Sequence, residues 1–497
     1  MRSARALLLA GLLLYAGWLW SKTGAYASGS DPSGYLNFAR LLLAGQWNCP
    51  RPSPLPPISE ISEAATIPLG FRPMPGQQMA PTYPIGLPLL LALGQLLAGP
   101  DTGPHLVMWV HALAGLALAF TIGRKLGLDQ GLAALGLLVL ATSQQYLFSS
   151  LHCMSDLPAM VWGSGAVWLA WLVRSHPQKW PWLALAAGAA FGVGVLIRPA
   201  NLMLVWPILF CLACSPRPLR ALLCLGLGGL PLAGVLLATN QAAYGQALTS
   251  GYGDLSSLFR LKYVPLALLH YARWLPVALS PLVLLGLGWP RMLRQSRFEA
   301  WLLLLWVLPS LAFYSVFKHT HDTWWYLRFL LPVFPPLLMG SLWTGRQLLR
   351  STQVRSAVAC LVVLWALHWE SRLQASGIGS GELAHLQLAR WTQKNLDRRG
   401  VILTLQVSGC LTYYTDFSLL RWDTMQPDDW LHLARWCEQQ QRPLYAVLFP
   451  FEVEGGALKR CPWGQWEPIG KMFAITMWRW NPAPSVPDRS APPHSPN

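Results

Sequence analysis

Residues 28–47 read SGSDPSGYLNFARLLLAGQW and come directly after the first long apolar run of the chain. From Tyr35 onward apolar side chains recur at helical spacing, as Phe38 and Leu42 do, which predicts a short amphipathic helix lying along a membrane surface. Asp31 stands just before that helix as an isolated acid. Two interpretations are open here: Asp31 is the N-cap of the helix, for which Asp is a favoured type, or it is a reactive carboxylate held at a bilayer face.

The composition of the chain is that of a membrane protein. Of its 497 residues, 53% are hydrophobic and only 12% are charged, and leucine-rich runs recur from end to end. The composition therefore predicts a polytopic α-helical membrane protein. The formal net charge of +16 would suit nucleic acid only if Lys and Arg gathered on one face. They are spread among the loops between apolar runs, so the charge is a topology signal and no nucleic-acid partner is expected.

The basic residues orient the predicted spans. Arg2 and Arg5 precede the first apolar run, which places the N-terminus in the cytoplasm and Asp31 on the opposite side. Residues 83–98 are apolar but fall short of the roughly 20 residues that cross a bilayer. If this segment only dips into or lies along the outer face, every later basic loop is cytoplasmic. About eleven spans remain, at residues 6–20, 105–123, 131–148, 157–173, 181–197, 200–214, 220–238, 264–288, 300–317, 325–345 and 354–369.

Three regions follow from this count. Residues 1–375 are expected to form the transmembrane domain, with a long first extracytoplasmic loop, 21–104, that carries amphipathic helices. Residues 376–480 have nearly balanced acids and bases and alternate predicted helices with strands, which indicates a small soluble α/β domain. Because the number of spans is odd, that domain is extracytoplasmic, like Asp31. The Pro- and Ser-rich tail, 481–497, is expected to be disordered.

Two features of processing stay open at this point. Residues 25–27, AYA, resemble a signal-peptidase site, so the first apolar run is either cleaved or kept as a span. Cys410, Cys437 and Cys461 lie in the polar C-terminal region, where a disulfide can form. Their odd number leaves the pairing undecided.

Polar residues at the expected outer ends of the spans form the candidate site. Asp156 stands at the outer entrance of the fourth span, where it is either an N-cap or a second reactive acid. Arg198 ends the fifth span and either anchors to headgroups or binds an anion. His270 and Arg273 lie three residues apart in the eighth span, and an Arg at bilayer depth normally faces a cavity or a partner.

The loop between the ninth and tenth spans carries the densest group of charges: Lys318, His319, His321, Asp322 and Arg328. Arg328 lies just inside an aromatic belt, where its planar guanidinium group suits a phosphate. His319, His321 and Asp322 are weak candidates for a divalent metal site, because a lone His-x-His in a loop is a short pattern. No other cofactor is indicated.

Four stretches, in this order, resemble the GT-C fold glycosyltransferases that use polyprenyl-phosphate sugars, a group that includes protein O-mannosyltransferases and lipid A aminoarabinose transferases. They are DPSGYLNFARLLLAGQW, TYPIGLPLLLALGQLLAG, SDLPAM and WWYLRFLLPVFPPLL. Together they cover most of residues 1–345. In that family an acid of the first extracytoplasmic loop is taken as the catalytic residue, and Asp31 matches it. Many members have an acidic pair there, whereas this chain has Asp31-Pro32, which argues against a role that needs two adjacent carboxylates.

The resemblance implies an integral-membrane glycosyltransferase of the plasma membrane, the inner membrane in a bacterium. It would move a sugar from a polyprenyl-phosphate donor to an acceptor lipid, glycan or protein on the extracytoplasmic face, with inversion. Asp31 would be the general base and Asp156 a second catalytic carboxylate. The substrate-binding residues and membrane-lipid contacts would then come from Arg328, Arg273, His270, Lys318, His321 and Tyr83.

Two other classes of function are alternatives to a glycosyltransferase. A membrane transporter or lipid flippase would work without covalent chemistry, but alternating access expects a site near the bilayer midplane. The polar residues of this chain collect on one side instead. A scaffold that only displays the C-terminal domain would not need His270 and Arg273 inside a span.

Overall fold

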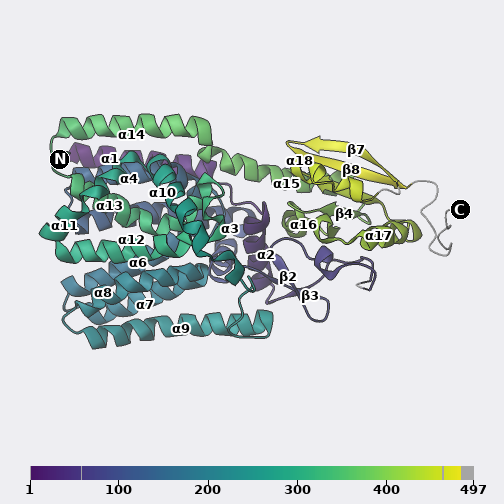
Figure 1. Ribbon diagram of the computed structural model, residues 1–497, viewed down its shortest axis with the longest axis horizontal. Coiled ribbons are helices and arrows are strands. Elements are labelled where there is room, and N and C mark those ends of the chain that lie inside the picture. The colour runs from purple at the N-terminus through teal and green to yellow at the C-terminus, as the bar shows by residue number, and fades with distance from the viewer. Residues whose placement is uncertain (1, 58, 462–463, 483–497) are drawn as a thin grey trace. The chain divides into compact units, whose positions relative to one another are not determined.

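The computed structural model describes residues 2–57, 59–461 and 464–482 (Figure 1). The chain divides into two compact units. The helical unit joins Met1–Ala25 to Pro84–Gly381, and the α/β unit joins Tyr26–Tyr83 to Glu382–Asn497. The first loop therefore folds with the C-terminal region. The tail that was expected to be disordered lies outside the described residues from position 483 on.

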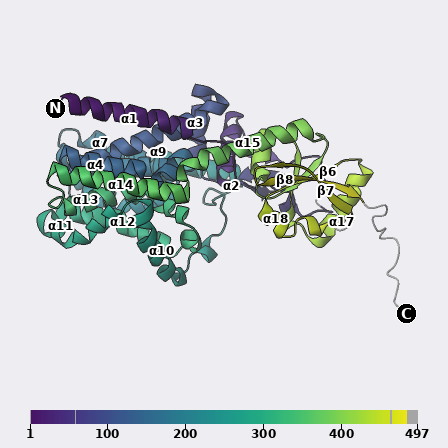
Figure 2. The same cartoon turned by 90° about the horizontal axis from the view of Figure 1, so that it is seen from above.

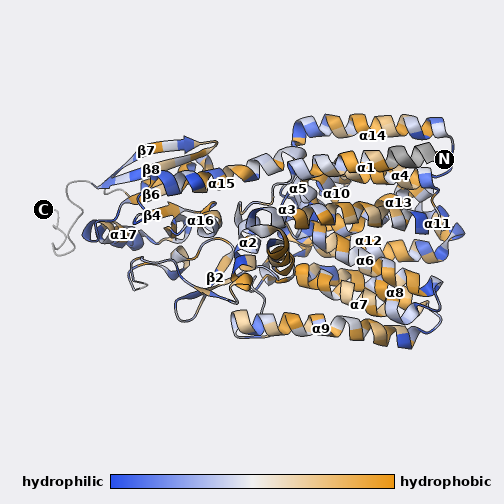
Figure 3. Cartoon of the chain, turned by 180° about the vertical axis from the view of Figure 1, so that it is seen from behind, coloured by the Kyte–Doolittle hydropathy of each residue, from blue (hydrophilic) through white to orange (hydrophobic). Residues whose placement is uncertain are grey.

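The helical unit is made of long helices in which apolar residues dominate (Figure 3). Within the described residues, seven helices are long and apolar enough to cross a membrane, and up to nine spans result if each of two bent pairs counts as one. The helices are α1 (Arg2–Lys22), α3 (Gly86–Lys125), α4 (Gln130–Thr142), α5 (Gln144–Leu151), α6 (Asp156–Ser175), α7 (Trp180–Ile197), α8 (Val205–Ala213), α9 (Pro218–Tyr244), α10 (Val264–Ala278), α11 (Trp289–Gln295), α12 (Arg297–Ser315), α13 (Phe334–Gly345) and α14 (Thr352–Leu373).

These helices confirm the prediction of a polytopic α-helical membrane protein. The two bent pairs are α4 with α5, at 61°, and the segments Leu261–Ala278 and Pro281–Gln295, at 117°. They fall where the third and eighth spans are expected. The other two expected spans fall on α1 and on the shorter apolar segment Pro199–Ala213.

Helix α3 contains the segment that was expected not to cross. It is 40 residues long, about 60 Å at 1.5 Å per residue and twice the hydrocarbon thickness of a bilayer. Gly99, with φ 83° and ψ 168°, breaks it into two helices just before Pro100. A Cβ added at Gly94 would lie 2.7 Å from the carbonyl oxygen of Gly103. The two halves therefore fold back on each other, and only glycine permits so close an approach.

Contacts between loops gather basic residues at one end of the helical unit. Arg355, at the start of α14, makes a bidentate ion pair with Asp129 before α4, with distances of 2.8 and 2.7 Å. Arg174, near the end of α6, lies 4.0 Å from the ring centre of Phe298 in α12. Asp156 begins α6 and so lies about 30 Å from this basic end, the length of a 20-residue helix.

The α/β unit is built on a five-stranded sheet with strand order β5-β4-β6-β8-β7. Strand β4 pairs in parallel with β5 and β6, and β8 runs antiparallel between β6 and β7. The strands are β4 (Val401–Thr404), β5 (Ser418–Arg421), β6 (Leu444–Leu448), β7 (Gly464–Met472) and β8 (Ile475–Pro482). The α/β nature predicted for this region is confirmed.

Helices cover both faces of this sheet (Figure 2). Alternate residues of β4 point to opposite faces, so Val401 and Leu403 share a core with α17, and Ile402 shares one with α15 and α16. The helices are α15 (Ile378–Asn395), α16 (Ser408–Tyr414), α17 (Pro427–Gln439) and the short α18 (Pro450–Glu454). The short elements β5, α16 and α18 and the strand β7 were not anticipated from the sequence.

The first loop completes this unit. It contributes α2 (Ser30–Leu43) and a three-stranded antiparallel sheet of β1 (Cys49–Pro50), β3 (Gln78–Pro81) and β2 (Phe71–Met74). Ile61 and Ala65 are buried in the same core as Trp430 of α17. Residues 26–83 are therefore an integral part of the C-terminal fold.

All nine cysteines fall within the described residues, and all are free. Cys437 and Cys461 are buried in one core. Burial raises the pKa of Cys437 to about 12. The pairing that the sequence left undecided is thus absent from the described residues.

Gly103→Val should destabilise the helical unit. A Cβ at Gly103 would lie 2.4 Å from the backbone of Gly94, and relieving such overpacking costs about 1–3 kcal/mol. The melting temperature of the purified protein in detergent measures the effect. Gly165→Ala is the control, because a Cβ there meets nothing within 4 Å. Equal melting temperatures for the two variants would contradict the tight hairpin of α3.

Candidate functional site

Three charged side chains meet in the helical unit around Asp156. The Asp156 side chain, at the first residue of α6, is 1% exposed. Its Oδ1 accepts a hydrogen bond from Arg198, which directly follows α7, and its Oδ2 lies 3.9 Å from Nε of Arg328. Nε of Arg198 also donates to the hydroxyl of Tyr314 at 3.0 Å. One carboxylate is thus shared by two guanidinium groups.

Prolines fix two of these side chains locally. Pro158 occupies the first turn of α6, where proline is favoured, so the helix begins at Asp156. Pro199 disfavours helical backbone at the residue before it, and Arg198 is extended, with φ −148° and ψ 108°. Arg198 therefore leaves the helix axis. The N-cap of α6 is Ser155, so the interpretation of Asp156 as an N-cap is wrong.

Two guanidinium groups lie beside one carboxylate in this cluster. The side chains of Arg198 and Arg328 are only 17% and 13% exposed. The ring of Phe329 lies 5.0 and 5.4 Å from their guanidinium carbons. Guanidinium groups donate paired hydrogen bonds to phosphate oxygens, so two neighbouring arginines are chemically suited to a phosphate.

Asp31 lies in the α/β unit, in the first turn of α2. The N-cap of that helix is Gly29, with φ 37°, so the interpretation of Asp31 as the N-cap is wrong. The hydroxyl of Tyr83 donates to Oδ1 of Asp31 at 2.6 Å, and that of Ser30 does so at 3.3 Å. The rings of Tyr35 and Tyr83 lie 4.6 Å apart. Two hydroxyl donors therefore orient the carboxylate.

Helix α2 is present as predicted, and most of it is buried. Its buried residues run without a break from Pro32 to Ala39 and include the polar Ser33 and Asn37. The burial therefore extends around the helix and is not confined to one apolar stripe.

The predicted substrate-binding cations do not all lie in the cluster around Asp156. Arg328 alone among them joins the Asp156 cluster. His270 is 6% exposed, with its ring 6.4 Å from that of Trp274. Arg273 was expected to face a cavity, yet it is exposed and lies 4.9 Å from the ring centre of Trp274. Lys318 is exposed as well.

The three weak metal candidates do not converge. Nδ1 of His319 lies 2.7 Å from Oδ2 of Asp322. His321 packs its ring against that of Tyr263, with centres 5.9 Å apart. In the part of the chain that the structure describes, no three His, Cys, Asp or Glu side chains are grouped to hold a metal ion.

Sequence reasoning missed Tyr314 and left Arg198 with two open roles. Tyr314 lies near the end of α12 and is 8% exposed. A signal existed for it, because a buried tyrosine hydroxyl in an apolar helix needs a hydrogen-bond partner. The partner itself, Arg198, could not be identified from spacing.

The apolar helices and the small α/β unit define a GT-C type of membrane fold. No protein-family model and no curated protein matches this chain. Among solved structures the chain is similar to ArnT from Cupriavidus metallidurans. For the apo state the TM-score is 0.60, with 14% identity, covering 96% of this chain and 98% of that one. For ArnT bound to undecaprenyl phosphate the TM-score is 0.59, with the same identity and coverage.

The arabinofuranosyltransferase AftD from Mycobacteria is similar as well. Its TM-score is 0.51 at 13% identity, covering 96% of this chain and 40% of that one. These matches confirm the fold that the sequence resemblance predicted.

Asp156→Asn should lower the melting temperature strongly. The variant removes a carboxylate that is 1% exposed, pairs with Arg198 and lies beside Arg328, and breaking a buried ion pair costs about 3–5 kcal/mol. Asp129→Asn is the matched control, because its pair with Arg355 is exposed and worth about 0–1 kcal/mol. Comparable shifts for the two variants, measured by thermal unfolding in detergent, would show that the Asp156 pair is not a buried one.

Proposed function

We propose that this protein is an integral-membrane glycosyltransferase that transfers a sugar from a polyprenyl-phosphate donor to an acceptor on the extracytoplasmic face. The observation that carries the proposal is the cluster of Asp156, Arg198 and Arg328, in which two largely covered guanidinium groups lie beside one carboxylate and are suited to donate paired hydrogen bonds to a phosphate. The fold is shared with ArnT, which has been solved with undecaprenyl phosphate bound. A phosphate-binding cluster at a helix end is what a lipid-phosphate donor requires.

The proposed topology has eleven spans. The seven long helices, the two bent pairs, α1 and the segment Pro199–Ala213 supply them. The basic end of the helical unit is cytoplasmic by the positive-inside rule. The Asp156 end and the C-terminal region are then extracytoplasmic, and the first half of α3 does not cross.

In the proposed reaction Arg328 and Arg198 bind the donor phosphate. The phosphate gains charge as its bond to the sugar breaks, and fixed cations stabilise that charge in the transition state. Asp156, predicted as a second catalytic carboxylate, holds both guanidinium groups in place. His270, His321, Lys318 and Arg273 are secondary candidates for contacts to the sugar or to lipid headgroups.

An apolar groove in the helical unit is the proposed site of the isoprenoid tail. It has a volume of about 400 Å³ and is lined from Tyr271 to Trp289 and by α12 and α13 residues such as Val307 and Leu337. Its Tyr271 end lies beside Tyr314, the partner of Arg198. The groove therefore leads away from the charged cluster between apolar walls.

Asp31 is the proposed general base. It takes the proton from an acceptor hydroxyl or amine as that group attacks the anomeric carbon. The carbon–oxygen bond to the phosphate breaks, and the polyprenyl phosphate leaves with the bonding electrons. A single displacement of this kind inverts the anomeric centre. The hydroxyl of Tyr83 donates to Asp31 and orients this proposed base.

Asp31→Asn should lower the turnover number by at least about 10²-fold, because a positioned general base contributes roughly 10²–10⁴ in rate. The assay follows a labelled sugar from a polyprenyl-phosphate donor to acceptor in reconstituted vesicles. Asp416→Asn, an exposed carboxylate of the same unit, should retain full activity. Undiminished transfer by Asp31→Asn would refute the assigned base. A protein that moves lipid across the vesicle without any sugar transfer would be a flippase.

Arg328→Gln should raise the donor KM by about 10- to 100-fold, since a hydrogen bond to a charged group is worth about 1.5–3 kcal/mol. Arg355→Gln removes an arginine that is likewise paired with an aspartate, but at the basic end of the unit, and should leave the donor KM unchanged. The measurement is initial transfer rate against donor concentration. Unchanged donor kinetics in Arg328→Gln would remove Arg328 from the phosphate site.

A further inference from the structure

Helix α2 is held on the face opposite to Asp31. Ser33, Asn37 and Arg40 are spaced i, i+4 and i+7, which places them on one side of the helix. At 3.6 residues per turn, Asp31 and Tyr35 lie on the other side. The helix therefore presents its carboxylate on one face and is anchored by the other.

The anchor is the short helix α16. Asn37 is 2% exposed, and its Nδ2 donates to the carbonyl of Gly409 at 2.9 Å. The guanidinium of Arg40 donates to the carbonyls of Tyr413 at 2.7 Å and Thr412 at 3.3 Å. These carbonyls belong to the last turn of α16, where helix carbonyls lack partners within the helix. Arg40 thus caps α16 while it ties α2 to it.

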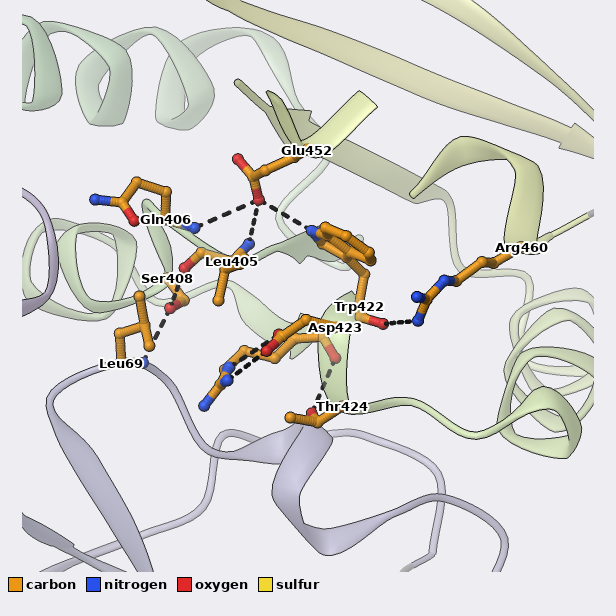
Figure 4. Close-up of polar contacts among 10 residues, drawn as sticks. Leu69, Leu405, Gln406, Ser408, Trp422, Asp423, Thr424, Glu452 and Arg460 are labelled. Atoms are coloured by element: carbon orange, nitrogen blue, oxygen red, sulfur yellow. Dashed lines mark hydrogen bonds and ion pairs between the residues drawn. The ribbon is translucent and has the colours of Figure 1, made fainter. Parts of the chain in front are cut away.

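The two helices approach so closely that one position must be glycine. A Cβ at Gly409 would lie 2.2 Å from Oγ of Ser33 and 2.7 Å from the carbonyl oxygen of Leu69. The hydroxyl of Ser408 accepts a hydrogen bond from the backbone N–H of Leu69 at 3.0 Å (Figure 4). The start of α16 is therefore fastened to the first loop at two neighbouring residues.

A buried carboxylate fixes the loop from which α16 starts. Glu452 is 0% exposed. Its Oε1 accepts from the N–H groups of Leu405 at 2.9 Å and Gln406 at 3.4 Å and from the indole of Trp422 at 3.0 Å (Figure 4). Its Oε2 accepts from the N–H of Phe449 at 2.8 Å. Four donors therefore hold this carboxylate between the loops that follow β4 and β6.

The location of Glu452 bears on what the sheet does. Strand β4 lies between β5 and β6 in the sheet. The chain passes from β4 to β5 on one side of β4 and returns later to form β6 on the other side. The crevice outside the carboxyl ends of such parallel strands is where open α/β sheets usually bind ligands. Here the side chain of Glu452 and its four N–H donors occupy that place. The sheet accordingly supports the loops that follow β4 and β6.

We infer that the α/β sheet is a positioning device for the catalytic carboxylate. Glu452 fixes the loop before α16, α16 holds the back of α2 through Asn37, and α2 presents Asp31 to the substrate. Asn37 is a positioning residue in this chain of contacts. The inference rests on the proposed role of Asp31 as general base.

Asn37→Ala tests it. The expected result is a turnover number lower by about 10- to 100-fold, because a displacement of about 1 Å can cost 10²-fold in rate. The donor KM should stay within about twofold of wild type, since the phosphate contacts are untouched. The matched control is Asn395→Ala in α15, which removes another asparagine bond to a backbone carbonyl, that of Trp391 at 2.8 Å. It should leave the turnover number unchanged.

Should Asn37→Ala not fold, Arg40→Gln carries the same test at an exposed position. A lower turnover number at unchanged donor KM, seen in the α2 variant and not in Asn395→Ala, supports the inference. Turnover within about twofold of wild type, or a loss that appears equally as a raised donor KM, overturns it. Asp31→Asn is assayed beside them. If it abolishes transfer while Asn37→Ala keeps turnover within about twofold of wild type, only the positioning role fails. If it retains full transfer, the base assignment itself fails.

Discussion

The polar end of the helical unit depends on the carboxylate of Asp156. It joins the start of α6 to the end of α7 through Arg198 and approaches Arg328, which lies before α13. Guanidinium groups at the end of apolar helices persist only with a partner or a cavity. The single carboxylate lies beside both guanidinium groups. The cluster therefore joins the ends of three helices.

Glu452 shows the contrasting case in the α/β unit. Its carboxylate is also buried, but four N–H groups surround it. Buried charges that are fully hydrogen-bonded rigidify their surroundings. No described cation pairs with Glu452, so no positive charge is left over for a ligand. The two buried acids thus have different roles. Glu452 stabilises the fold of the α/β unit, and Asp156 lies among the charged side chains of the helical unit.

The sequence alone predicted the features that a bilayer imposes on the chain. Hydropathy and the spread of basic residues predicted the apolar helices, because length and apolar content are local properties. Periodicity also predicted a helix from about Tyr35 onward, which the structure shows as α2 with an earlier start, at Ser30. Its surroundings were not predictable, because Asn37 bonds to Gly409, 372 residues away. A buried helix with polar residues on its packed face looks amphipathic when its partner is unknown.

The candidate site shows the same limit. Arg328 was identified because an aromatic belt beside it marks depth in the membrane, whereas the importance of Arg198 depends on Asp156 and Tyr314, which are distant in sequence. For Arg273, helical spacing gave a face of the helix but not what that face meets, which in the structure includes Trp274. Pairing across spans is decided by tertiary packing, which local patterns do not record.

The two acids Asp156 and Asp31 have different surroundings. The carboxylate of Asp156 pairs with Arg198 and lies 3.9 Å from Nε of Arg328. Asp31 accepts hydrogen bonds from the hydroxyls of Tyr83 and Ser30. The acid that pairs with arginine is thus suited to arranging the proposed phosphate site, and the acid that accepts hydrogen bonds from hydroxyls is suited to the proposed proton transfer.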